Sequence, residues 1–182
     1  MKIKETKEMK ELKKAIREIP DFPKKGILFY DVTTLMANGK AFSKALDLLV
    51  KRYKDKKIGA IAGIEARGFV FGAALADRLG TGIVLMRKKG KLPYKTIRES
   101  YSLEYGTDEI EMHVDAIKKN QRVLVVDDLL ATGGTASAAA RLIKKAGGKV
   151  VEAAFLVELI DLKGREKLKP VESFSLLQYE GE

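Results

Sequence analysis

The sequence predicts an α/β fold in which helices flank a parallel, twisted sheet. Strand-like and helix-like segments alternate twice along the chain, and the strand-like segments are short continuous apolar runs. Continuous apolar runs are typical of parallel strands that are covered on both faces. Alternating strands and helices form right-handed crossover units around one sheet. We expect the whole chain, residues 1–182, to form a single domain.

The first 35 residues are expected to form an appendage beside the core. Apolar residues recur at helical spacing at Met9, Leu12, Ile16 and Ile19, which predicts an amphipathic helix between residues 6 and 20. A loop over residues 21–26 and a short strand over residues 27–30 follow, and a second amphipathic helix is expected over residues 40–53.

The core α/β region is expected over residues 58–157. The first unit has a strand over residues 58–62, a helix over 68–79 and a strand over 82–86. The second has a strand over residues 122–126, a helix over 134–146 and a strand over 150–157. Residues 97–114 are more polar and partly alternating, which predicts an antiparallel excursion that begins with a flexible loop.

Composition excludes several kinds of chemistry. The chain has no Cys and one His, so disulfides and thiolate catalysis are excluded and histidine-rich metal sites are disfavoured. No apolar leader or membrane-length run is present, and we expect a cytoplasmic protein. The net charge is +10, but basic and acidic residues are interleaved except over residues 87–98, which contain six basic residues and no acid. Such a basic loop suits a small polyanion better than nucleic acid.

The most informative segment is Val123–Thr135, where an apolar run meets two acids and then a glycine-rich turn that opens a helix. The backbone N–H groups of that turn and the positive end of the helix dipole favour a phosphate. Asp127 and Asp128 would repel a phosphate, but as hydrogen-bond acceptors they suit the two hydroxyls of a ribose. The segment therefore predicts a site for ribose 5-phosphate. The alternative is an ordinary turn in which the acids only cap the helix.

At these residues the chain resembles the type I phosphoribosyltransferases. The similarity extends from about Ile19 to Tyr179 and includes residues 65–69, 87–93, 101–106 and 162–168 in the order of that family. The resemblance implies the family's fold, with a hood region near the N-terminus and a flexible loop. It also implies phosphoribosyl pyrophosphate as substrate, Mg²⁺ held mainly by substrate oxygens and water without a direct protein ligand, and a homodimer.

The resemblance also assigns residues to the three parts of a phosphoribosyl pyrophosphate site. The ribose and its 5-phosphate are expected at Asp127, Asp128, Ala131, Thr132, Gly133, Gly134 and Thr135. Pyrophosphate is expected at Glu65, Ala66, Arg67, Arg87, Lys88 and Lys91. Residue Glu104 is the expected catalytic proton carrier, and Tyr105 is expected to shape a closed lid.

The acceptor base is expected between Phe29 and Leu159, with the backbone of Leu28 and Tyr30 bonding to its edge. In the 6-oxopurine members of the family an acid stands at the position of Ala131. The absence of this acid favours adenine as the acceptor base, and the sequence of residues 123–135 is similar to that of the adenine-specific members. Two alternatives remain: transfer to another base such as xanthine, or a regulator that senses phosphoribosyl pyrophosphate and binds nucleic acid. We do not expect nucleic acid as a partner, because no separate DNA-binding segment is apparent.

Overall fold

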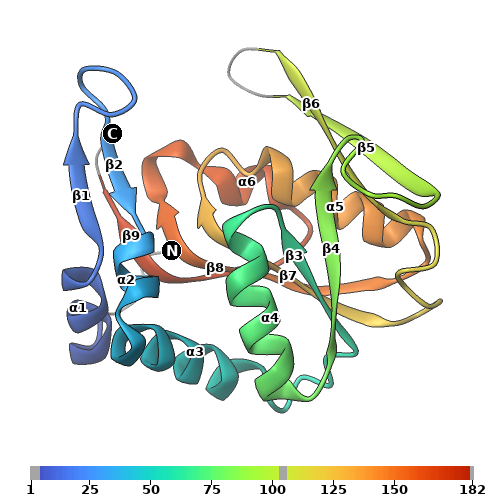
Figure 1. The fold of residues 1–182 in the computed structure, drawn as a ribbon, viewed down its shortest axis with the longest axis horizontal. Coiled ribbons are helices and arrows are strands. Elements are labelled where there is room, and N and C mark those ends of the chain that lie inside the picture. Colours follow the sequence, from blue (N-terminus) through green and yellow to red (C-terminus); the bar gives the residue numbers. More distant parts are fainter. Residues whose placement is uncertain (1–4, 103–105, 181–182) are drawn as a thin grey trace.

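A seven-stranded sheet forms the centre of the molecule within residues 5–102 and 106–180, the part of the chain that the computed structural model describes (Figure 1). A parallel block runs in the order β4 (Gly82–Lys88), β3 (Ala60–Ile64), β7 (Arg122–Leu130), β8 (Lys149–Leu159) and β9 (Ser173–Tyr179). The hairpin of β5 (Thr96–Ser102) and β6 (Thr107–His113) joins β4 antiparallel, as the alternating segment predicted.

Strand β7 shows why its sequence is continuously apolar. Leu124 and Val126 belong to one core cluster, and Val123 and Val125 belong to the cluster on the opposite face. Because successive side chains of a strand point to opposite faces, a strand covered on both sides must be apolar at every position. This arrangement confirms the predicted parallel sheet with helices on both faces.

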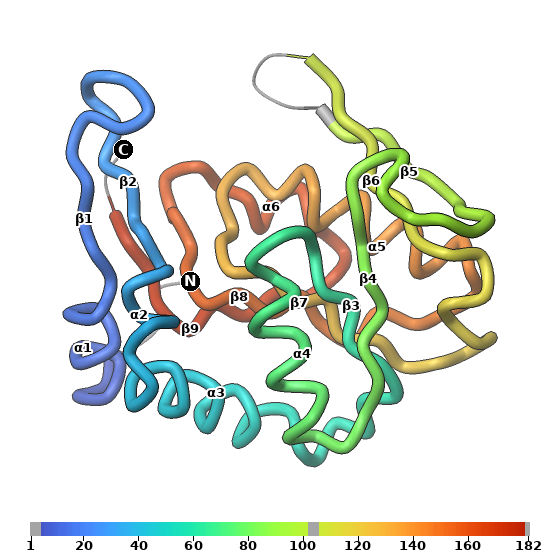
Figure 2. Tube along the Cα trace, viewed as in Figure 1, coloured from blue at the N-terminus to red at the C-terminus, as the bar shows by residue number. Residues whose placement is uncertain are grey.

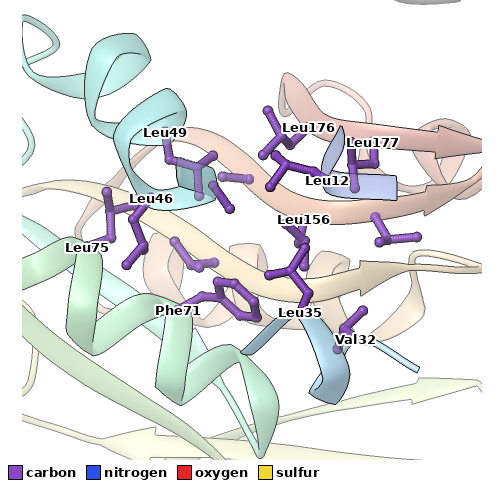
Figure 3. Close-up of a cluster of buried hydrophobic side chains, with 14 of the residues drawn as sticks. Leu12, Val32, Leu35, Leu46, Leu49, Phe71, Leu75, Leu156, Leu176 and Leu177 are labelled. Carbon is purple, nitrogen blue, oxygen red and sulfur yellow. The ribbon is translucent and has the colours of Figure 1, made fainter. Parts of the chain in front are cut away.

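Helices cover the two faces in separate groups. α1 (Lys7–Lys14), α3 (Gly39–Tyr53) and α4 (Arg67–Leu79) lie on one face, where Leu12, Leu49, Phe71 and Leu156 pack together (Figure 3). α5 (Gly134–Lys145) and the short α6 (Gly164–Leu168) lie on the other face. None of the helices in the described ranges is long and apolar enough to cross a membrane.

The N-terminal segment differs from the prediction of one long helix. α1 ends at Lys14, and Arg17–Pro20 forms strand β1, which pairs antiparallel with β2 (Leu28–Asp31). Ile19, which matched the helical spacing, instead lies opposite Phe29 in this hairpin. A residue before proline is disfavoured in the helical region, and pairing with a distant strand completes the change. A short helix, α2 (Thr33–Ala37), then leads to α3.

The C-terminal half also departs from the predicted bounds. β7 continues to Leu130, so Asp127 lies within the strand, opposite Phe155 of β8, and not after it. β8 extends to Leu159, and a short 3-10 turn (Ile160–Leu162), α6 and β9 follow without having been predicted as elements. The polar residues Asp127 and Glu158 suggested that β7 and β8 ended before them, although the two strands remain paired to Leu130 and Glu158.

The two hairpins stand at opposite ends of the molecule and flank the carboxyl ends of the parallel strands between them (Figure 2). One is the β1–β2 hairpin, which lies in the segment that was expected to form the hood, and the other is the β5–β6 hairpin. The carboxyl edge of the sheet, between the two hairpins, is where open α/β folds bind ligands.

Candidate active site at the carboxyl edge of the sheet

Three motif-bearing segments meet at one edge of the sheet. β3 pairs in parallel with both β4 and β7, so the carboxyl ends of these strands lie side by side. Glu65 follows β3, Arg87 lies near the end of β4, and Asp127 lies near the end of β7. The parallel register thus brings together residues that are up to 62 positions apart in sequence, as from Glu65 to Asp127.

The glycine-rich turn opens helix α5 in a form that suits an anion. Gly133 is the N-cap with φ +78°, a left-handed conformation that favours glycine. No side chain within the described residues caps this helix end, and its first turn contains no acid. Thr132 is exposed and Gly134 and Thr135 are half-buried. The uncapped N–H groups and the helix dipole can therefore bind a phosphate here.

The two adjacent acids differ in their surroundings. The Asp128 carboxylate is nearly buried and accepts a hydrogen bond from Arg67 Nε at 2.5 Å. The half-buried Asp127 accepts a bond from the Asp128 backbone N–H at 2.9 Å. Burial, and then repulsion by Asp128, raises the pKa of Asp127 well above its ordinary value. A ligand hydroxyl or a cation beside Asp127 would stabilise its ionised form.

The turn from β3 into α4 approaches β7 closely because the second residue of α4 is a glycine, Gly68. The Glu65–Ala66 peptide bond is cis, and α4 begins at Arg67. A Cβ on Gly68 would lie 2.8 Å from Asp127 Oδ1 and 2.8 Å from the Val126 carbonyl oxygen. The site residues expected from the sequence do not include Gly68, although a glycine where a strand leads into a helix is a signal of such a close approach.

The Glu65 side chain organises the basic segment after β4. Its carboxylate accepts bonds from the Arg87 guanidinium at 3.0 and 3.3 Å and from the Lys88 backbone N–H at 3.0 Å. The hydrogen bonds from Arg87 hold the pKa of Glu65 below its ordinary value. Arg87 also donates to the Lys91 carbonyl oxygen at 2.9 Å. The Glu65 carboxylate is therefore occupied by protein donors. The side chains of Lys88 and Lys91 are exposed, and Lys88 Nζ pairs with Asp108 at 3.2 Å.

A residue that the sequence did not point to fixes the rest of this basic loop. Glu111 of β6 is buried, and its carboxylate accepts bonds from the backbone N–H groups of Gly90 at 2.9 Å and Leu92 at 3.3 Å. It also accepts bonds from Thr96 and Arg98, each at 3.1 Å. In the sequence Glu111 looked like one of several alternating acids of an exposed strand.

The β5–β6 hairpin is attached next to the glycine-rich turn. Arg141 of α5 donates to Glu99 at 3.1 Å and to the Ser100 carbonyl oxygen at 2.8 Å. The hydroxyl of Tyr101 hydrogen-bonds to Asp108 at 3.2 Å and also interacts with Thr135. Glu104 and Tyr105, expected as proton carrier and lid residue, lie outside the described residues.

The expected base-binding residues come from the hood and from the end of β8. Phe29 packs edge to face with Phe22, with ring centroids 5.1 Å apart. Leu28 and Leu159 are partly buried against the core cluster. The Tyr30 ring packs on Tyr179, with centroids 4.0 Å apart, so its side chain is used in packing. Within the described residues β2 pairs with β1 alone, which leaves one backbone edge of β2 available for a ligand.

Comparison with known proteins agrees with this geometry. Residues 31–179 match the phosphoribosyl transferase domain family. The adenine phosphoribosyltransferase of Syntrophotalea carbinolica is 59% identical over 94% of this chain and 100% of its own length.

Two crystal structures are also similar over almost the whole chain. The adenine phosphoribosyltransferase of Thermoanaerobacter pseudethanolicus has a TM-score of 0.91 and 51% identity, covering 94% of this chain and 99% of that one. The Saccharomyces cerevisiae enzyme, complexed with an imino-altritol bisphosphate and adenine, has a TM-score of 0.88 and 41% identity over 93% and 98% of the two chains. With the family model matching from the end of β2 to the end of β9, this chain belongs to the phosphoribosyl transferase domain family and, within it, to the adenine phosphoribosyltransferases.

Proposed function

We infer that this chain transfers the 5-phosphoribosyl group of phosphoribosyl pyrophosphate to adenine, giving AMP and pyrophosphate. The observation that carries this inference is the uncapped, glycine-started end of α5 beside the acid pair at the carboxyl edge of the sheet. Relatives more than 50% identical are adenine phosphoribosyltransferases, and the Saccharomyces cerevisiae relative was crystallised with an imino-altritol bisphosphate and adenine. The reaction salvages a purine base.

The phosphate and ribose parts of the substrate are assigned to the segment after β7. The backbone N–H groups of residues 131–135 would hold the 5-phosphate at the positive end of the α5 dipole. Asp127 and Asp128 would accept bonds from the ribose hydroxyls. The ionised form of Asp127 is disfavoured in the ligand-free protein, and hydrogen bonds from the ribose hydroxyls would favour that form.

Pyrophosphate is assigned to the cations that face the same edge. Arg67, Arg87, Lys88 and Lys91 would stabilise the negative charge that grows on pyrophosphate as its bond to ribose C1 breaks. Glu65 is assigned to this group through its hold on Arg87 and Lys88, because a carboxylate in direct contact with pyrophosphate would be repelled. Ala66 contributes backbone at the turn.

Adenine is assigned to the space between the hood and the end of β8. A base nitrogen attacks ribose C1 from the face opposite the leaving pyrophosphate, and the proton on that nitrogen must be removed. Phe29 and Leu159 would hold the ring, and the free backbone edge at Leu28 and Tyr30 would bond to its rim. Glu104 is the proposed proton acceptor, with Tyr105 in the lid that excludes water.

The carboxylates of Asp127 and Asp128 also suit a nearby Mg²⁺ ion that is held mainly by substrate oxygens and water. Carboxylate oxygens are the ligands that this ion prefers, but no group of three or more acids or histidines gathers anywhere in the described ranges. Oxygens of the substrate and water would therefore complete the ion's shell, with Asp127 and Asp128 facing it. When bound, Mg²⁺ supplies charge neutralisation for the leaving pyrophosphate. Turnover is expected to stop with EDTA and to return with added Mg²⁺.

A homodimer is part of this proposal. Val70 of α4 and Leu85 of β4 are 42% and 40% exposed and belong to two elements that pack on each other. A second copy would cover this apolar surface, and the basic segment that continues β4 would then lie beside the interface. Light scattering should report a dimer for the wild type and a monomer for Leu85→Glu. A monomeric wild type would contradict the dimer.

The base preference is tested by a panel of acceptors. Purified protein with phosphoribosyl pyrophosphate and Mg²⁺ should release pyrophosphate far faster with adenine than with hypoxanthine, guanine, xanthine or orotate, because Ala131 stands where 6-oxopurine enzymes have an acid. Equal rates, or none with adenine, would overturn the proposal. The double variant Asp127→Asn, Asp128→Asn should lose turnover while keeping the fold, and wild-type activity in it would dismiss the ribose assignment.

A further inference from the structure

The glycine-rich turn rests on the chain just before α6. A Cβ on Gly133 would overlap the carbonyl oxygen of Gly164 and lie 3.2 Å from its Cα. A Cβ on Gly164 would in turn overlap the carbonyl oxygen of Ala131 and lie 2.9 Å from Leu130 Cδ1. The two glycines therefore let the backbone of the turn and the backbone of residue 164 touch directly. Any shift of residue 164 must move the turn.

Arg165, which follows Gly164, is attached to strands β8 and β9 by several hydrogen bonds. Arg165 donates through Nε and Nη2 to the two oxygens of Glu158, each at 2.5 Å. It also donates to the Ser173 carbonyl oxygen at 2.7 Å and to the Ser175 hydroxyl at 3.3 Å. Glu158 is buried, and it further accepts a bond from Gln178 at 2.9 Å. A bidentate arginine held by four acceptors has little freedom to move.

The anchoring acid stands beside the start of the turn. Glu158 of β8 pairs in register with Leu130 of β7, the residue directly before Ala131. The acid thus fixes Arg165 and Gly164 at the level of the strand end from which the turn departs. The position of the turn is therefore defined by two contacts: the backbone contact with Gly164 and the pairing of Leu130 with Glu158 of β8.

We propose that Glu158, Arg165 and Gly164 form a positioning unit that holds the glycine-rich turn in the geometry needed to bind the substrate's 5-phosphate. None of the three contacts the phosphate; they act through the backbone of residues 131–133. The inference rests on the proposed function of this turn. Backbone N–H donors bind an anion well only when their directions are fixed in advance, and displacements near 1 Å can cost about 100-fold in rate.

The chain contains a matched control for this unit. Near the other end of β8, Glu152 is also buried and accepts a bidentate pair of bonds from Arg52, at 2.6 and 2.9 Å. The side chains of Arg52 and Arg165 are similarly accessible, at 35% and 29%. Arg52 lies in the last turn of α3, and the side chains that it contacts, Glu152, Tyr53 and Phe174, lie outside the glycine-rich turn. Loss of either arginine removes a bidentate bond to a buried glutamate of β8. Only Arg165 follows the residue that contacts the glycine-rich turn.

The experiment compares Arg165→Gln with Arg52→Gln. Both variants should lose thermal stability to a similar extent. Only Arg165→Gln should raise KM for phosphoribosyl pyrophosphate, by about 10-fold to 100-fold, with KM for adenine within about twofold of wild type. The affinity for ribose 5-phosphate, measured by calorimetry, should fall in parallel. Arg165→Lys keeps the positive charge but not the bidentate guanidinium, so its affinity for ribose 5-phosphate should lie between those of Arg165→Gln and wild type.

A second pair of variants covers the case in which Arg165→Gln does not fold. Gly164→Ala should weaken ribose 5-phosphate binding, whereas Gly148→Ala should not, although its Cβ would also lie within 3.0 Å of neighbours, at 2.7 Å from Ile117. The proposal is overturned if the arginine variants have equal KM values for phosphoribosyl pyrophosphate, or if the glycine variants bind ribose 5-phosphate equally. An inactive wild type that still shows the difference in ribose 5-phosphate binding would refute the proposed reaction and leave the positioning unit standing.

Discussion

Arg67 and Asp128 form an ion pair across the candidate site, with 2.5 Å between Arg67 Nε and Asp128 Oδ2. The pair links the first residue of α4 to β7. Although burial opposes the charge, Asp128, Asp127 and Asp31 together raise the pKa of Arg67. The proposed roles send this guanidinium to pyrophosphate and this carboxylate to ribose, so the substrate must separate the two. The ion pair therefore satisfies both groups only until the substrate offers each a partner.

Arg67→Gln is predicted to lower kcat/KM for phosphoribosyl pyrophosphate by about 10-fold to 100-fold, the loss expected for one charged hydrogen bond of about 1.5–3 kcal/mol. KM for adenine should change little, because Arg67 donates its hydrogen bond to Asp128 of β7 and not to any of the proposed base-binding residues. The matched control is Arg78→Gln on the same helix, where the arginine pairs with Asp47 at 2.5 Å. Steady-state kinetics on both substrates decide, and equal effects of the two changes would remove Arg67 from the pyrophosphate site.

Asp127→Asn is predicted to abolish turnover and yet stabilise the ligand-free protein near neutral pH. Burial, and then the charge of Asp128, raises the pKa of Asp127 above its ordinary value of 3.8. As pH rises above 3.8 the unfolded chain loses this proton before the folded chain does, so the folded state is increasingly disfavoured. The neutral amide avoids that cost.

The measurement is the melting temperature between pH 4 and pH 8, taken as the difference between Asp127→Asn and wild type. We expect the difference to be small at the acidic end and to grow toward neutral pH. Asp128→Asn provides the comparison and should gain less, because it relieves the repulsion of Asp127 but also weakens the bond from Arg67. A destabilised Asp127→Asn at pH 8 would mean that its charge is well solvated in the folded protein.

Much of the fold follows from local patterns in the sequence. The apolar runs and helical spacing predicted the parallel sheet, its crossover helices and the antiparallel hairpin. The strand β1 could not be predicted, because Ile16 and Ile19 fit a helix by spacing and the partner strand that overrides it is 10 residues away, as in the pairing of Ile19 with Phe29. β9 was missed because it depends on pairing with β8, from Ala153 with Ser173 to Leu159 with Tyr179.

The site shows the same division. The segment after β7 could be read from its residue types, because a phosphate and a diol each require a particular kind of partner. The supporting residues could not, since Glu111, Gly68 and Arg165 differ from ordinary surface residues only by what they contact in three dimensions. A buried acid that accepts four bonds and an acid on an exposed strand have the same sequence pattern.

Glu152→Gln is predicted to reduce the loss of stability that the protein shows on acidification. Burial opposes ionisation of Glu152, but the bonds from Arg52 and Tyr53 outweigh it and hold its pKa below the ordinary value of 4.5. A depressed folded-state pKa contributes stability above 4.5, and that contribution is lost as pH falls through the folded value. The variant lacks this contribution at every pH.

The test is denaturant unfolding at pH 7 and at several values from pH 5 to pH 3. At pH 7 the variant should be less stable by about 1.5–3 kcal/mol, the usual range for hydrogen bonds to a charged group. The gap to wild type should narrow toward pH 3. Exposed Glu166→Gln is the control and should track the wild type at every pH. A constant gap would show that the ionised form of Glu152 is not favoured by folding.

Gly68→Ala is predicted to impair the site through backbone contact alone. The added Cβ would lie 2.8 Å from both Asp127 Oδ1 and the Val126 carbonyl oxygen, and neither can yield without moving β7 or the acid. The loop that carries Arg67 must then retreat from Asp128, so catalytic efficiency with phosphoribosyl pyrophosphate should fall by about 100-fold. Gly39→Ala should leave the rate unchanged, because Gly39 lies in the first turn of α3 and no tertiary neighbour among the described residues is within 4 Å of the new Cβ. If the two alanine variants turn over equally fast, the contact between α4 and β7 does not set the geometry in which the substrate reacts.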